Sequence, residues 1–146
     1  MLVHGTAIAI DRKAVLLRGS PGAGKSDLAL RLIDGGACLV SDDQVELRRA
    51  GQRILVRAPA ALAGLIEVRG IGILRIDALD EAPLALCVDL VSSKEIERLP
   101  ERRFDNLLEL AVPLIALSAF EVSATAKLRF ALRAFSEEGL PAIVPP

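Results

Sequence analysis

Residues 19–26 read GSPGAGKS and fit the pattern G-x-x-x-x-G-K-[ST]. The segment follows a short apolar run that predicts a strand over residues 14–17, and it opens an amphipathic run that predicts a helix over residues 25–33. Glycines at these positions let successive backbone N–H groups turn toward one anion, and the start of the helix adds the positive end of its dipole. This strand, loop and helix context is the one that a phosphate-binding P-loop requires. The sequence therefore predicts a nucleotide-binding α/β fold.

Two side chains of this loop have expected roles of their own. Lys25 would reach the β- and γ-phosphates of ATP as a point charge, and the Ser26 hydroxyl would ligate Mg²⁺. The residues expected to bind the nucleotide are Gly19, Ser20, Pro21, Gly22, Ala23, Gly24, Lys25 and Ser26.

The rest of the chain predicts a β-rich core, because short apolar runs alternate with turn signals more often than with long helical patterns. The expected strands cover residues 6–10, 14–17, 38–41, 45–49, 53–57 and 84–91, with loop and strand over 65–76. Helical spacing recurs over 125–135, one or two helical turns are expected within 93–99, and residues 106–117 predict a helix-like piece and a strand around Pro113.

Length and charge narrow the classes of protein. A chain of 146 residues, 52% of them hydrophobic, predicts one domain over residues 1–146. With 18 basic and 19 acidic residues the net charge is −1, so the chain lacks the excess of positive charge that binds a nucleic-acid backbone. No apolar run approaches the roughly 20 residues that span a bilayer. We expect a cytoplasmic protein without nucleic-acid or membrane partners.

Cys38 and Cys87 lie in apolar runs and are expected to be small buried residues without a catalytic, redox or metal-binding role.

A bound nucleotide needs a carboxylate near its metal, and two positions compete for that role. Asp89 lies near the end of the apolar run LALCVDL, as in an ordinary P-loop nucleotidase, whereas Asp42 and Asp43 follow the strand immediately after the P-loop helix. Position in the chain favours the doublet, in which one carboxylate could join the metal shell and the other accept a hydroxyl proton. A solvated turn before the next hairpin is the competing interpretation.

Two segments together resemble a known family. GSPGAGKSDLALRLIDGGACLVSDDQVEL (19–47) and LIEVRGIGIL (65–74) resemble the catalytic domain of the bacterial HPr kinase/phosphorylase family, in which a P-loop is followed by V-A-D-D and by L-E-[IV]-R-G-[LI]-G-[IL]. The resemblance is strong over residues 3–76 and weak after about residue 90. It implies a P-loop fold similar to phosphoenolpyruvate carboxykinase, ATP and Mg²⁺ as cofactors, and phosphorylation of a serine of HPr, the phosphocarrier of the sugar phosphotransferase system.

The resemblance also implies roles for individual residues. It makes Asp43, with Asp42 beside it, the base that takes the proton of the substrate serine, and it makes Glu67 a second metal ligand. His4 falls where the family keeps an H-G pair near the active site, although a lone histidine near a chain end is otherwise a surface residue. Arg98, in E-R-L, matches an arginine of a family D-R-L-G segment in which Pro100 here replaces the glycine.

Departures from the family leave part of the function open. The resemblance implies a short form that has the catalytic domain only, and a homo-oligomer, since the family tends to hexamers. Residues 116–127, ALSAFEVSATAK, lack the basic P-V-R-P-G-R-N stretch that the family ties to phosphorolysis, so dephosphorylation of HPr stays undecided. The alternatives are a P-loop small-molecule kinase and a nucleotide-sensing regulatory module without catalysis.

Overall fold

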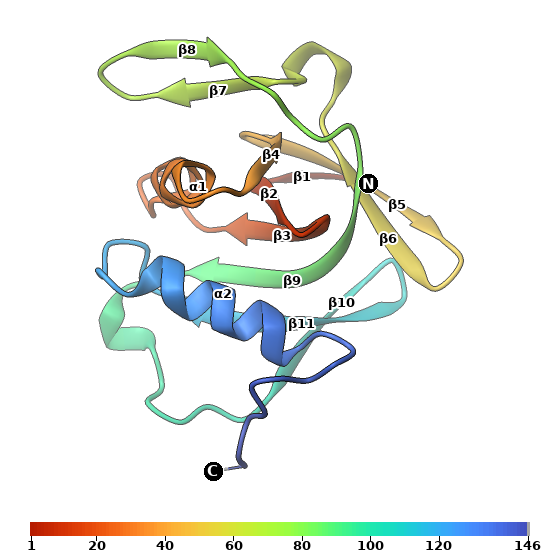
Figure 1. The fold of residues 1–146 in the computed structure, drawn as a ribbon, viewed down its shortest axis with the longest axis vertical. Coiled ribbons are helices and arrows are strands. Elements are labelled where there is room, and N and C mark those ends of the chain that lie inside the picture. The colour runs from red at the N-terminus through yellow and green to blue at the C-terminus, as the bar shows by residue number, and fades with distance from the viewer. Residues whose placement is uncertain (146) are drawn as a thin grey trace.

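The computed structural model describes residues 1–145 and is built around the hairpin that leads into the P-loop (Figure 1). Strand β2 (Thr6–Ile10) pairs antiparallel with β3 (Lys13–Arg18). Asp11 and Arg12 of the connecting turn have φ values of 50° and 65°, which matches the left-handed pair of a two-residue hairpin loop. Both expected strands are confirmed, and β3 delivers the chain directly into residues 19–24.

The hairpin is part of a nine-stranded sheet that forks at its longest strand. The path β1-β5-β6-β9-β3-β2-β4 carries a branch through β11 to β10. Strand β9 pairs antiparallel with β6 at its start, in parallel with β3 from Leu84, and in parallel with β11 from Cys87. The other strands are β1 (Leu2–His4), β4 (Cys38–Ser41), β5 (Gln44–Ala50), β6 (Arg53–Arg57), β9 (Ala82–Leu90), β10 (Arg103–Leu107) and β11 (Leu110–Leu117). The carboxyl ends of the three parallel strands β3, β9 and β11 therefore meet at one edge, where ligands of open α/β sheets bind.

Two hydrophobic cores lie on opposite faces of the central strands, since alternate residues of a strand point to opposite sides. In β3, Val15 and Leu17 face the helices, whereas Ala14 and Leu16 face strands β5 and β6, which curl over the other side. Helix α1 (Lys25–Asp34) and helix α2 (Ala124–Ala134) cover the first face with Leu28, Leu32, Leu128 and Leu132. Every residue of β3 from 14 to 17 is buried, so this strand holds the P-loop on a rigid base.

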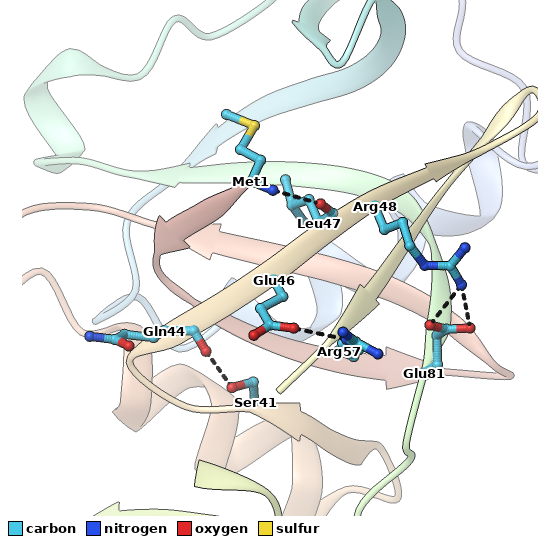
Figure 2. Close-up of polar contacts among 8 residues, drawn as sticks. All are labelled: Met1, Ser41, Gln44, Glu46, Leu47, Arg48, Arg57 and Glu81. Carbon is cyan, nitrogen blue, oxygen red and sulfur yellow. Dashed lines mark hydrogen bonds and ion pairs between the residues drawn. The ribbon is translucent and has the colours of Figure 1, made fainter. Parts of the chain in front are cut away.

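Polar contacts close the curled layer formed by β1, β5 and β6. The amino group of Met1 donates to the carbonyl of Leu47 over 3.1 Å, and the Leu47 amide donates back to Met1 over 2.8 Å. Figure 2 shows these elements with the cross-strand pair between Arg57 and Glu46 at 2.8 Å. The contacts tie the start of the chain to β5 and so fix the residues that come just before β2.

A small hairpin of β7 (Leu65–Val68) and β8 (Gly72–Arg75) projects from the body and forms its own two-stranded sheet (Figure 1). A short 3₁₀ helix, η1 (Ala60–Leu62), precedes it. Ile66 and Val68 pack with Leu39 of β4 in a third, smaller core, while Ile71 and Ile73 are exposed. One face of β7 therefore anchors the hairpin beside α1 and β4.

Two expectations about the chain were wrong: a helix-like piece within 106–117 and the burial of Cys38. The helix-like piece within 106–117 is absent, because β10 and β11 form an antiparallel hairpin around Leu108 and Glu109, both at positive φ. Pro113 lies one residue before β11 begins to pair with β9, where the missing N–H leaves that ladder intact. Cys38 is exposed at the start of the edge strand β4, although Cys87 is buried as expected. Residues 93–99 hold one 3₁₀ turn, η2 (Ser93–Glu95), in line with the one or two helical turns expected there.

Within residues 1–145, neither helix has the length and apolar character needed to cross a bilayer.

Candidate active site

The P-loop runs from Gly19 to Gly24 between β3 and the first residue of α1. Gly22 and Gly24 have φ values of 84° and 97°, a conformation that side chains rarely adopt. A Cβ on Gly24 would also come within 2.7 Å of the Ala119 Cβ and 3.1 Å of the Phe120 ring. Gly24 is therefore required both by its backbone and by the loop after β11, which packs against it.

Lys25 lies folded over this loop. Its Nζ donates to the carbonyl of Gly19 over 2.6 Å and to that of Ser20 over 3.2 Å. These carbonyls hold the ammonium beside the backbone that would surround a phosphate. A cation already held at the loop, with helix α1 opening behind it, fits the binding of a polyphosphate.

Asp42 is the most constrained acidic group near the loop. Its Oδ1 accepts hydrogen bonds from Ser26 Oγ at 2.8 Å and Thr6 Oγ1 at 3.0 Å, and its Oδ2 accepts from the Glu67 amide at 3.1 Å. The residue is only 7% exposed. Three donors from three different elements thus fix the carboxylate next to the P-loop serine.

Asp43 has the opposite environment although it is the next residue. Its φ of 73° is left-handed, a region that aspartate tolerates better than most residues, and its side chain is exposed. The turn is held by Gln44 N donating to Asp42 O at 2.9 Å, by Gly5 N donating to Asp43 O at 3.1 Å, and by the Ser41 hydroxyl donating to the Gln44 carbonyl (Figure 2). The backbone therefore separates the doublet into one buried and one accessible carboxylate.

Of the other expected site residues, His4 and Glu67 lie beside the aspartate doublet, and Arg98 does not. His4 is exposed at the end of β1, opposite Gln44, and the next residue contacts Asp43, so His4 lies beside the doublet. Glu67 reaches Asp42 through its amide, and its carboxylate is exposed. Arg98 is exposed between η2 and β10 and, among the residues that the structure describes, makes no hydrogen bond or ion pair; no contact brings it to the P-loop.

Asp89, the competing metal carboxylate, is engaged elsewhere. Arg18 Nε donates to Asp89 Oδ1 at 2.8 Å, and Arg18 Nη1 pairs with Asp105 of β10. Burial alone would lower the pKa of Arg18, but its hydrogen bonds to Asp105 and Asp89 outweigh burial and raise that pKa. Asp89 therefore belongs to an ion-paired triad with Arg18 and Asp105, which joins β3, β9 and β10.

Cys87 lies two residues before Asp89 and is fully buried. Burial raises the pKa of the Cys87 thiol to about 12, with the negative charges of Asp105 and Asp89 adding to the effect and Arg18 opposing it. The thiol stays protonated at neutral pH, which agrees with the expectation that it has no chemistry.

The donor set around Ser26 fits a hard cation. The Ser26 hydroxyl and the Asp42 carboxylate are the oxygen ligands that Mg²⁺ takes in nucleotide sites, where water and phosphate oxygens complete the shell. In residues 1–145 no three His, Cys, Asp or Glu side chains gather closely enough to enclose a metal by themselves. A magnesium ion here would thus depend on the nucleotide for part of its coordination.

Sequence reasoning missed two residues at this edge of the sheet. Thr6 is a strand residue with no motif around it, so only the fold shows that its hydroxyl reaches Asp42. Phe120 follows β11 in a segment without a recognisable pattern, and only the packing places it against Gly24.

Comparisons with known proteins identify the family and the fold of this chain. Residues 1–128 match the family model described as HPr Serine kinase C-terminal domain. A solved structure, the Hpr(Ser) kinase/phosphatase from Coxiella burnetii, superposes with a TM-score of 0.81 at 26% identity, covering 91% of this chain and 94% of that chain.

Two curated relatives carry the name HPr kinase/phosphorylase. The protein from Caldicellulosiruptor bescii is 36% identical over 126 residues, which is 78% of this chain and 40% of the relative. The protein from Leptothrix cholodnii is 39% identical over 128 residues, 79% of this chain and 39% of the relative. This chain therefore spans about two fifths of the length of these relatives. The P-loop α/β fold expected from the sequence is confirmed, and the chain belongs to the family of HPr serine kinase C-terminal domains.

Proposed function

We propose that this chain is an ATP- and Mg²⁺-dependent protein-serine kinase whose substrate is HPr. The observation that carries the proposal is the contact between Ser26 and the buried Asp42 at 2.8 Å, with the exposed Asp43 as the next residue. The names of the relatives support the choice of HPr as the substrate.

The residues divide the work of in-line phosphoryl transfer, in which positioning and charge neutralisation supply most of the catalysis. When bound, ATP supplies the γ-phosphoryl group and Mg²⁺ neutralises charge on the phosphate oxygens. Lys25 and the loop amides hold the phosphates, and Ser26 with Asp42 holds the metal. Asp43 accepts the proton of the incoming serine hydroxyl, a step worth about a hundredfold or more.

Asp43 suits a protein substrate because a serine presented on another protein must meet a base at the surface. Its accessible carboxylate stands on a turn whose backbone accepts hydrogen bonds from the amides of Gly5 and of Gln44 in β5. His4 lies on the same exposed rim, and we propose that it contacts the substrate or the transferred phosphoryl group. Glu67 and Arg98 remain proposed contributors to metal binding and catalysis.

The test is transfer of label from ATP to purified HPr in the presence of Mg²⁺, followed by a chase with inorganic phosphate to examine reversal. Lys25→Ala should abolish transfer, and Asp43→Asn should lower its rate by about a hundredfold or more while nucleotide affinity stays within about twofold. The matched control is Asp11→Asn, since Asp11 is also an exposed aspartate at positive φ but lies at the other end of β2.

Other outcomes would replace the proposal. Turnover of ATP with a metabolite and none with HPr would identify a small-molecule kinase, and binding without any turnover would identify a sensing module. Full transfer by Lys25→Ala would remove the P-loop from the reaction altogether.

A further inference from the structure

A hollow of about 800 Å³ lies beside the P-loop at the carboxyl ends of β9 and β11. Its walls are residues 19–23, the segment 89–93 with Glu95, and two residues after β11, Ser118 and Phe120. The function proposed above uses only the P-loop wall. We refer to this space as the β9–β11 hollow.

The hollow and the metal-side carboxylate lie on opposite sides of β3. On one side of β3 lies β2 and then β4, after which Asp42 reaches Ser26, whereas β9 and then β11 follow on the other side. Terminal phosphates that reach Ser26 and Asp42 would occupy the first side of the loop. The rest of a nucleotide then has the β9–β11 hollow as the adjoining space large enough to hold it.

Phe120 presents an aromatic ring into this space. The side chain is 69% exposed, and among the residues that line the hollow it is the aromatic one. Its backbone is nevertheless held in place, because Arg31 donates to the carbonyl of Ala119 and the Glu121 amide donates to Ser118 O over 3.3 Å. The ring also packs close to Gly24 of the P-loop.

The wall that contains Ser92 and Glu95 is ordered as well. The Ser92 hydroxyl accepts from the Lys94 amide at 3.3 Å, and the Glu95 carboxylate accepts from the Ser92 amide at 3.2 Å, which together form a capping box at the start of η2. A hollow lined both by an ordered polar wall and by an exposed aromatic ring suits a flat group with polar edges and a ribose beside it.

We propose that Phe120 is the stacking platform for the nucleotide base, and that the β9–β11 hollow is the nucleoside subsite. This proposal rests on the proposed binding of the phosphates at the P-loop. Stacking is tolerant of base identity because every base has a π-face, so the subsite should accept ATP and GTP with similar affinity. It should contribute nothing to the binding of inorganic tripolyphosphate, which has no base.

The first test compares equilibrium binding of ATP and tripolyphosphate, with Mg²⁺, by calorimetry. Phe120→Ala should weaken ATP binding about tenfold, within the range found when aromatic side chains under a base are truncated, and should leave tripolyphosphate binding unchanged. The matched control is Phe130→Ala on α2, because Phe130 is 54% exposed but stacks with Arg133 away from the hollow.

A second variant gives a direct spectroscopic signal. The chain has no tryptophan, so Phe120→Trp introduces a single indole at the proposed platform. Its emission should be quenched by ATP and GTP and should not respond to tripolyphosphate, whereas Phe130→Trp should respond to none of them.

The outcomes separate this proposal from the one on which it rests. If the unaltered chain binds neither ATP nor tripolyphosphate, the proposed function fails. If it binds both, and Phe120→Ala leaves ATP affinity unchanged or weakens both ligands equally, the stacking platform is overturned while the P-loop assignment stands. A Phe120→Ala defect confined to transfer onto the protein substrate would likewise overturn it.

Discussion

Asp42 and Asp89 lie on opposite sides of the P-loop strand and have different partners. Asp42 accepts from two hydroxyls and one amide, all neutral donors, and one of these hydroxyls belongs to the P-loop serine. Asp89 accepts from the guanidinium of Arg18, which Asp105 also contacts. A neutral set of donors orients a carboxylate and leaves its charge available to a metal, whereas a bound guanidinium neutralises it.

This difference shows why a carboxylate at a strand end does not by itself mark a metal site. Asp89 lies near the end of β9, which pairs with β3, and Asp42 follows β4, which pairs with β2. The sequence pattern around Asp89 is the more usual one for a P-loop protein. The residues across from each carboxylate decide its role.

Exchanging each carboxylate for its amide should give the largest contrast. Asp42→Asn removes the charge beside Ser26, so transfer to HPr should fall by about a hundredfold or more, as expected when metal-based charge stabilisation is weakened. Asp89→Asn should change the transfer rate by less than about threefold. Radiolabel transfer at saturating ATP, with circular dichroism to confirm folding, measures both, and the reverse ranking would make Asp89 the metal carboxylate of a generic nucleotidase.

Removal of the cation in the triad should affect stability instead of catalysis. Arg18→Met leaves Asp89 and Asp105 as neighbouring like charges that are about one third exposed, so the free energy of unfolding should fall by about 2 kcal/mol, less than for a fully buried pair. Urea denaturation measures the change. Adding Asp105→Asn to Arg18→Met should recover part of the lost unfolding free energy. An unchanged urea midpoint for Arg18→Met would show that the triad does not contribute to stability.

The smallest effect concerns the residue that supports Asp42 from β2. Thr6→Val keeps the shape of a fully buried side chain but deletes the hydroxyl that donates to Asp42. We expect a loss of about 1 kcal/mol in unfolding free energy and a Mg²⁺ requirement that rises severalfold. Thr6→Ser retains the donor and is the matched control; equal Mg²⁺ titrations for the two variants would exclude a positioning role for Thr6.

Much of the central fold could be predicted from local pattern. Strands β2 and β4 and the start of α1 lie where alternation, glycines and helical spacing placed them, because these signals involve neighbouring residues. The hairpin of β10 and β11 was missed because its mixed apolar spacing also fits a helix. Pairing of β11 with β9, more than twenty residues away along the chain, favours the strand over the helix.

The sequence by itself determined that a polyphosphate loop follows β3, since glycine conformation, lysine and serine are local requirements. It also identified Asp42 and Asp43 as a doublet next to the loop, and the family to which the chain belongs. Only the tertiary structure decided that Asp42 turns inward to Ser26 while Asp43 faces solvent, that Arg18 engages Asp89, and that Phe120 lies at the P-loop. These facts depend on contacts between strands and loops distant in sequence, and no local pattern of residues carries them.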